Sequence, residues 1–339
     1  MNPVALMRPA PEVSSVGRTT LGTSGLTVSR IGVGLASLGR PAYMAWGRDA
    51  DLGEDRSIRA MRRRCHALLD GARAAGVSYV DTARSYGLAE QFLSAWCDDR
   101  RVPAGAVTVG SKWGYVYTGS WQRNAAVHEV KRLTIDTLRR QAVESRVILG
   151  PRLALYQIHS ATLESGVLDD CAVLSELARL RGTGLRIGLT VTGPAQAATI
   201  YRAIGIRIDG VALFQTIQAT WNLLEPSAGA ALAEARAVGY GVIVKEALAN
   251  GRLTDRYGGP AVDQLRAHAK ALDTSVETLA VAAALAQPWA DVVLSGAVTV
   301  EQLEAHLAAP LVSKSVEPFD TIAEPADTYW RTRSAMRWT

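Results

Sequence analysis

The chain has 339 residues, 48% of them hydrophobic and 20% charged, a composition typical of a globular protein with a large core. Its 37 Lys and Arg residues against 32 Asp and Glu give a net charge of +5, and because the basic residues are scattered, they argue against nucleic-acid binding. No apolar run is long enough for a signal peptide or a membrane span, and the three cysteines and the histidines lack metal-ligand spacing, so we expect a cytoplasmic protein without a metal site.

The N-terminal part combines a flexible segment with a predicted hairpin. Residues 1–16 contain three prolines, and we expect this segment to be flexible. Residues 19–28 read T-T-L-G-T-S-G-L-T-V, two short apolar runs around a Ser-Gly turn, which is typical of a β-hairpin. We expect this hairpin to plug the N-terminal end of the domain that follows.

Short β-branched runs then alternate with longer helical patterns, which indicates βαβ units and a parallel sheet. The predicted strands are residues 31–35, 77–82, 107–111, 153–159, 186–191, 210–215, 241–244 and 292–295. The predicted helices are residues 59–75, 129–149, 167–181, 194–204, 229–238, 275–286 and 300–308. Eight such strands close a (β/α)8 TIM barrel, to which we assign residues 17–312, with residues 313–339 as a tail over the barrel.

Polar side chains stand at the ends of three successive predicted strands. Asp81 closes V-S-Y-V-D, Lys112 closes V-T-V-G-S-K, and His159 closes L-A-L-Y-Q-I-H. Tyr86 lies on the loop after Asp81, from which it can reach the same face. Because the C-terminal ends of parallel barrel strands open on one face, we expect the four side chains to converge. A single strand-end Asp or Lys is more often a solvated or ion-paired group, so it is their joint placement that indicates a catalytic site.

Each of these four groups has a role in carbonyl reduction. Hydride addition to a carbonyl carbon leaves negative charge on the oxygen, which a proton donor must neutralise. A tyrosine hydroxyl with a pKa of about 10 is a weak acid, and an adjacent lysine ammonium lowers that pKa. Asp81 can orient Lys112, and His159 can hydrogen-bond the carbonyl oxygen. Read backwards, the same groups would oxidise an alcohol.

Several motifs give the chain a family resemblance. They are D-T-A-R-S-Y-G at residues 81–87, G-S-K-W at 110–113, Y-Q-I-H-S at 156–160, W-N-L-L at 221–224 and S-G-A-V-T-V-E-Q-L at 295–303. These strings resemble signature regions of the aldo-keto reductases, over nearly the whole chain. The resemblance implies an NAD(P)H-dependent enzyme with a catalytic tetrad of Asp81, Tyr86, Lys112 and His159. No G-x-G-x-x-G motif lies between a strand and a helix, so a doubly wound dinucleotide domain is not indicated.

The resemblance also implies the cofactor contacts. Gln218 and Trp221 match a Gln and, three residues later, an aromatic ring that stacks on the nicotinamide, with Trp in place of the usual Tyr. The other implied contacts follow the later strands; they are Ser160, Thr190, Leu248, Asn250, Arg252, Gly296, Thr299 and Gln302. Val298 and Thr299 stand where NADPH-preferring relatives often place Ser and Arg. We expect NADPH as the cofactor, with NADH as the alternative.

Three segments are longer than a barrel needs, namely residues 36–57, 113–128 and 313–339, and such loops are usually functional or disordered. Aromatic rings on loops at the barrel mouth would line an apolar or sugar-stacking pocket. The predicted substrate contacts are Tyr43, Trp46, Trp113, Tyr115 and Trp121. In the alternative interpretation some of these rings only anchor the loops.

Three functions are compatible with these residues. The first is NAD(P)H-dependent reduction of an aldehyde or ketone to the alcohol, with the proton from Tyr86. The second is NAD(P)+-dependent oxidation of a sugar hemiacetal or an alcohol. The third, against which the intact tetrad argues, is a non-catalytic regulatory module that binds the cofactor. The expected partner is a small carbonyl or sugar-like molecule, and the sequence carries no signal for an oligomeric state.

Overall fold

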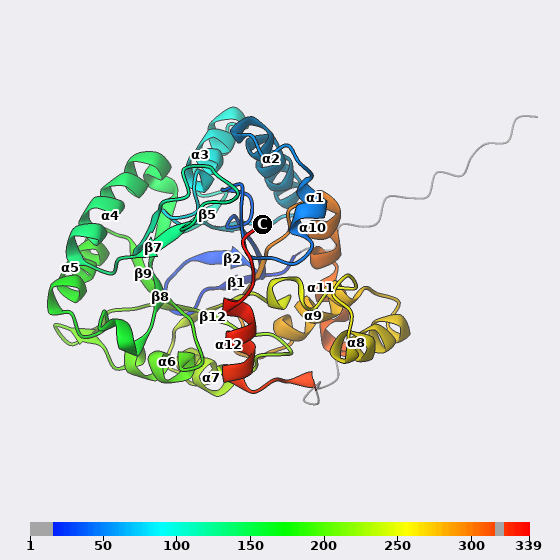
Figure 1. Ribbon diagram of the computed structural model, residues 1–339. Coiled ribbons are helices and arrows are strands. Elements are labelled where there is room, and N and C mark those ends of the chain that lie inside the picture. The colour runs from blue at the N-terminus through cyan, green and yellow to red at the C-terminus, as the bar shows by residue number, and fades with distance from the viewer. Residues whose placement is uncertain (1–15, 316–321) are drawn as a thin grey trace, which may run out of the picture.

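Eight parallel strands form a closed barrel in the computed structural model of the chain (Figure 1). The structure describes residues 16–315 and 322–339, so residues 1–15 of the predicted flexible segment and residues 316–321 of the predicted tail lie outside the described residues. In barrel order the strands are β12 (Thr216–Thr220), β13 (Gly241–Lys245), β14 (Val292–Ser295), β3 (Ile31–Gly34), β4 (Tyr79–Asp81), β5 (Thr108–Trp113), β8 (Leu153–Ala161) and β9 (Arg186–Val191). The predicted TIM barrel is therefore confirmed.

Helices form a layer around the barrel (Figure 1). They are α1 (Arg48–Leu52), α2 (Ile58–Ala74), α3 (Ala89–Asp99), α4 (Ile135–Leu149), α5 (Cys171–Gly182), α6 (Gln196–Ile204), α7 (Gly229–Ala237), α8 (Pro260–Ala271), α9 (Val276–Leu285), α10 (Val300–Leu307), α11 (Ala309–Val312) and α12 (Ala326–Ser334). Several begin at a capping side chain: Ser57 accepts a hydrogen bond from the amide of Ala60, and Asp170 accepts two from the first turn of α5. Among the helices of the described residues, none combines the length and apolar character needed to cross a membrane.

A hairpin closes the N-terminal end of the barrel, as the sequence predicted. Strands β1 (Arg18–Thr20) and β2 (Thr27–Ser29) pair antiparallel, and the fully buried Leu21 and Val28 pack with residues inside the barrel. The backbone at Gly22 has a positive φ, and a Cβ there would lie 2.2 Å from the amide nitrogen of Gly241, the first residue of β13. Only glycine allows this close approach of the hairpin to the strand end.

Two predicted elements differ from the structure. The strand expected at residues 210–215 is wrong, because Asp209 and Gly210 form the turn of a small hairpin, β10 (Arg207–Ile208) and β11 (Val211–Ala212), and the barrel strand β12 follows it. Asp-Gly is a strong hairpin-turn signal. The helix expected at residues 129–149 begins only at Ile135, because β7 (Glu129–Lys131) pairs with β6 (Tyr115–Tyr117) in the loop.

The C-terminal segment crosses the C-terminal face of the barrel. Figure 1 shows α12 in front of the barrel, with the chain end near the centre of the view. Tyr43 and Thr339 exchange two backbone hydrogen bonds, of 3.0 and 3.2 Å, which tie the chain end to the first long loop. The strand ends are therefore covered by the first loop and by the last residues of the chain.

Candidate active site

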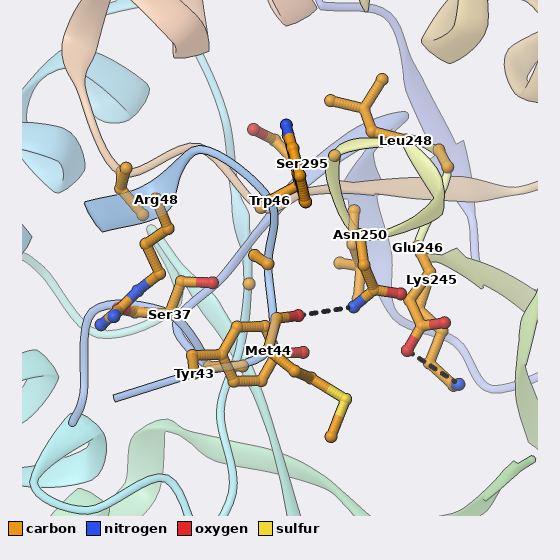
Figure 2. Close-up of a pocket in the computed structure, with 18 of the residues that line it drawn as sticks. Ser37, Tyr43, Met44, Trp46, Arg48, Lys245, Glu246, Leu248, Asn250 and Ser295 are labelled. Carbon is orange, nitrogen blue, oxygen red and sulfur yellow. Dashed lines mark hydrogen bonds and ion pairs between the residues drawn. The ribbon is translucent and has the colours of Figure 1, made fainter. Parts of the chain in front are cut away.

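A cavity of about 540 Å³ lies at the C-terminal ends of the barrel strands. Its walls come from the strand ends, from the first long loop and from the C-terminal segment, which contributes Arg333 and Trp338. Figure 2 shows one part of this cavity, where Asn250 donates a hydrogen bond to the carbonyl oxygen of Met44 across the space between β13 and the first loop. The distance between the amide nitrogen and that oxygen is 3.0 Å. The loop therefore forms one wall of the cavity.

The four predicted catalytic side chains converge in this cavity. Lys112 forms a buried ion pair with Asp81, and its Nζ lies 3.2 Å from the hydroxyl of Tyr86. The hydroxyl of Tyr86 lies 3.5 Å from Nε2 of His159, and the two rings meet edge to face. A substrate oxygen in contact with Tyr86 would therefore also be near the imidazole.

Asp81 is held from several strands at once. Gln218 on β12 donates to its Oδ2 at 2.9 Å, Tyr79 on β4 at 3.3 Å and Gln157 on β8 at 3.4 Å. Lys112 on β5 contacts the other carboxylate oxygen. Because all these donors are buried and fixed, the carboxylate holds Lys112 in one position below Tyr86.

Burial dominates the proton equilibria of this group. It raises the pKa of Tyr86 well above its ordinary value of 10, the charge of Asp81 adds to the effect, and Arg40 acts against it. The expected lowering of the pKa of Tyr86 by Lys112 is therefore outweighed, and the phenol keeps its proton at neutral pH. When that proton leaves, the ammonium at 3.2 Å is placed to stabilise the tyrosinate.

The imidazole of His159 is neutral. Burial lowers its pKa well below the ordinary value of 6.5, and the positive charges of Lys112, Arg40 and Lys245 lower it further. A neutral imidazole with a proton on Nε2 can donate a hydrogen bond to a carbonyl oxygen without transferring the proton.

Most of the predicted cofactor contacts line the cavity. They are Ser160, Thr190, Gln218, Leu248, Asn250, Gly296 and Gln302. Thr190 accepts a hydrogen bond of 2.7 Å from the amide of Ser160, which brings the ends of β8 and β9 together. The space beside Gly296 is open, since a Cβ built there meets no atom within 4 Å.

Three predicted cofactor contacts do not line the cavity and have partners within the chain. The ring of Trp221 is buried edge-on against Trp289, so it does not face the cavity. Arg252 pairs with Glu324 of the C-terminal segment. The hydroxyl of Thr299 caps α10 by accepting a hydrogen bond from the amide of Gln302.

The predicted substrate rings divide in the same way. Tyr43, Trp46 and Tyr115 line the cavity, and Tyr115 lies edge-on to His159. The ring of Trp113 is buried and does not line the cavity, because successive strand residues point to opposite sides and Lys112 points inward. Trp121 also lies outside it, donating to the carbonyl oxygen of Arg56 at 2.8 Å and packing against Phe92. The ring of Trp113 packs in the core, and the ring of Trp121 anchors its loop.

Charged residues that the sequence did not single out line the part of the cavity near the tetrad. Arg40 is buried over the ring of Tyr86 and pairs with Glu129 at 2.7 Å. Lys245 and Glu246 stand at the end of β13, and Arg333 reaches Glu246 from α12. The sequence signal was a pair of charged residues at the end of an otherwise apolar strand, V-I-V-K-E.

Another part of the cavity, between α1, α9 and α10, is lined by three carboxylates and by the guanidinium of Arg256. Asp51, Glu277 and Glu301 line it, and among them Asp51 pairs with Arg256. Gln302 donates to Asp51 at 2.7 Å and accepts from the amide of Val298 at 3.0 Å. Hydrogen-bonding groups at the N-terminal end of α10 are thus partly occupied by partners within the chain.

The cavity suits an extended, polar cofactor of the nicotinamide class. Among the described residues, Oδ1 of Asn250 is buried in the cavity wall with no hydrogen-bond partner, so a ligand donor would satisfy it. Ser160, Gln218 and the open space at Gly296 line the same cavity. The residues present fit such a group.

Comparison with known proteins agrees with this architecture. An aldo-keto reductase from Bacillus halodurans, solved in its holo form, superposes with a TM-score of 0.68 at 20% identity, covering 92% of this chain and 97% of that one. A protein from Pseudomonas aeruginosa assigned to the aldo-keto reductases superposes with a TM-score of 0.62 at 21% identity, covering 88% of this chain and 96% of that one.

At these identities the likeness concerns the fold alone, and no functionally curated protein sequence matches the chain significantly. Residues 30–325 match the sequence profile of the Aldo/keto reductase family. Because that match spans most of its length, the chain belongs to the aldo/keto reductases, oxidoreductases that act on carbonyl compounds with a nicotinamide cofactor.

Proposed function

We propose that this protein reduces the carbonyl group of a small aldehyde or ketone to an alcohol, with Tyr86 as the proton donor. The observation that carries the proposal is the position of the Tyr86 hydroxyl in the cavity, 3.2 Å from Nζ of Lys112 and 3.5 Å from Nε2 of His159. A carbonyl oxygen bound there meets a proton donor and a neutral imidazole together.

The bound nicotinamide cofactor supplies the hydride that adds to the carbonyl carbon. Tyr86 gives its proton to the carbonyl oxygen as the C–O π electrons move onto that oxygen, so that the alcohol and a tyrosinate result. Lys112 stabilises the tyrosinate, and Asp81 fixes Lys112. His159 orients the carbonyl oxygen, and a proton from solvent then restores the phenol.

The proposed cofactor is NADPH, by resemblance to the family, with NADH as the alternative. The acidic lining at Asp51, Glu277 and Glu301 supports the alternative, because carboxylates accept hydrogen bonds from ribose hydroxyls and repel an added phosphate. The remaining proposed contacts are Ser160, Thr190, Gln218, Leu248, Asn250, Gly296 and Gln302.

Oxidation of a sugar hemiacetal or an alcohol is the second candidate function. It is supported by the same tetrad geometry, since the proton and hydride transfers run in either direction. Burial raises the pKa of Tyr86, so the phenol is protonated in the resting protein, but the tetrad alone favours neither direction.

The test is a screen of aldehydes, ketones and sugars with NADPH and NADH. Turnover is monitored through the absorbance of the reduced nicotinamide, in both reaction directions. We expect consumption of the reduced cofactor with at least one carbonyl class and a loss of that activity in Tyr86→Phe. Cofactor binding without any turnover, unaltered by Tyr86→Phe, would instead favour the non-catalytic regulatory module.

A further inference from the structure

Lys245 is a second lysine in the cavity wall, distinct from the lysine of the tetrad. It is the last residue of β13, opposite Thr220 in the parallel register, and it lines the cavity together with Tyr86 and His159. Its Nζ donates a hydrogen bond of 2.7 Å to the hydroxyl of Thr220. Figure 2 shows its side chain beside that of Glu246.

The nearest carboxylate neutralises Lys245 only weakly. Nζ of Lys245 lies 3.8 Å from Oε1 of Glu246, beyond hydrogen-bond distance. Both carboxylate oxygens of Glu246 are engaged by Arg333, whose Nε lies 2.8 Å from Oε2, and Thr220 donates to Oε2 as well. The carboxylate of Glu246 is therefore bound mainly by Arg333 and not by Lys245.

Lys245 stands outside the tight ion pairs that line the cavity near the tetrad. Three tight pairs balance: Asp81 with Lys112, Glu129 with Arg40, and Glu246 with Arg333. Lys245 is the fourth cation of this set, and among the described residues the charges that act on it are Glu246, Arg333, Lys112 and Asp81. A buried cation with this environment attracts an anionic ligand group.

The charge of Lys245 also acts on the position where the carbonyl would bind. It is one of the cations that lower the pKa of His159. Burial of Lys245 itself, with Arg333 and Lys112 nearby, lowers its own pKa to about 8. An anion beside Lys245 would stabilise its charged form and offset the effect of burial.

We propose that Lys245 is the anion-binding residue of the substrate site, and that the substrate is an oxo acid, a carbonyl compound whose carboxylate pairs with this ammonium. The inference rests on the proposed reductase function, which it deepens by naming the substrate class. The charge-assisted bond fixes the carboxylate end of the substrate, while Tyr86 and His159 hold the carbonyl end.

The experiment compares oxo acids of increasing chain length with their methyl esters, on the whole protein with each cofactor. Wild type should show a kcat/KM for the best acid roughly tenfold or more above that for its ester, since hydrogen bonds to charged groups are worth this much. Lys245→Met should remove most of this preference by raising KM for the acid, with little effect on the ester. Lys245→Arg should restore part of it.

The matched control is Lys270→Met, which removes an exposed lysine on α8 that does not line the cavity. It should behave as wild type. Binding of the same acid and ester is measured by calorimetry in parallel, so that the comparison does not depend on turnover.

The outcomes separate the two proposals. Selective binding of the acid that Lys245→Met abolishes, without turnover in wild type, would uphold the inference and refute the reductase function. Equal binding of acid and ester by wild type, or a preference that survives Lys245→Met, would overturn the inference alone. A loss of cofactor affinity in Lys245→Met as large as the loss for the acid would assign the anion to the cofactor's phosphates and likewise overturn it.

Discussion

Arg333 of α12 holds the buried carboxylate of Glu246 at the end of β13 in an ion pair made of two hydrogen bonds. This contact joins residues 87 positions apart in sequence and fastens the last helix over the barrel mouth. Burial acts to raise the pKa of Glu246, but Arg333, Lys245 and the hydroxyl of Thr220 together lower it to about 2, so the carboxylate stays charged throughout the ordinary pH range.

Replacing Arg333 should therefore loosen the C-terminal segment. In Arg333→Met the carboxylate of Glu246 stays buried without its main partner, and we expect the free energy of unfolding to fall by about 2 kcal/mol. This is less than the loss usual for breaking a fully buried ion pair, because Arg333 is partly exposed. Hydrogen exchange of residues 326–334 should become faster. Arg331→Met, an exposed arginine on the same helix, is the control. Unchanged exchange in Arg333→Met would show that other contacts hold the helix.

The proton-transfer assignment is tested by two substitutions in the tetrad. Tyr86→Phe removes the donor and Lys112→Met removes the charge that stabilises the tyrosinate, so each should lower kcat by roughly 100-fold to 10,000-fold. Cofactor binding, followed by fluorescence titration, should stay largely intact. Near wild-type rates in either variant on a confirmed substrate would exclude the assigned role.

Cofactor preference is tested near the start of α10. Thr299→Arg adds a cation at a helix N-terminus, and Glu301→Gln removes a carboxylate from the cavity wall, so both should raise the affinity for NADPH relative to NADH. Glu304→Gln, an exposed carboxylate on the same helix outside the cavity lining, should leave the ratio unchanged. The measurement is the ratio of the two dissociation constants. A constant ratio in both variants would place the 2′-phosphate elsewhere.

Stability should fall in mild acid because of His306. This imidazole is buried, its Nδ1 lies 2.7 Å from the hydroxyl of Ser295, and burial lowers its pKa to about 4. The unfolded chain binds a proton at its ordinary value of 6.5, so the stabilisation present above that pH is lost as the pH falls toward about 4. The full loss is of order 3 kcal/mol.

The check is denaturant unfolding of wild type and His306→Gln at several pH values across this range. The variant should lose less stability than wild type on acidification, because it has no imidazole to protonate. Parallel pH profiles for the two proteins would show that other groups cause the acid sensitivity.

The sequence predicted the barrel and the tetrad because both depend on short local patterns. Asp81, Lys112 and His159 end strands, and parallel strand ends must meet on one face. The side of the strand on which each neighbouring ring lies was not predicted. Trp113 follows Lys112, which points into the barrel, so Trp113 points outward. The alternation of side chains along a strand would have indicated this.

Other features depend on pairs distant in sequence. No residue near Glu246 in the sequence indicates a pairing with Arg333. A charged pair at a strand end is usually solvated, so its place inside the cavity could not be predicted from the sequence. The turn at Asp209 and Gly210, by contrast, could have been predicted from the Asp-Gly pair. The apolar residues that follow were instead interpreted as a strand that begins at Gly210.

The donors around Asp81 separate the four tetrad residues into two kinds. Asp81 accepts hydrogen bonds from side chains on β4, β5, β8 and β12, so losing it would leave these buried donors, the charged Lys112 above all, without their acceptor. Tyr86 stands on a loop, and its hydroxyl contacts Lys112 on β5 at 3.2 Å and His159 on β8 at 3.5 Å. A variant that keeps Asp81 and Lys112 but lacks the hydroxyl of Tyr86 should therefore keep the buried ion pair and the folded barrel, so that activity and fold can be lost separately at this site.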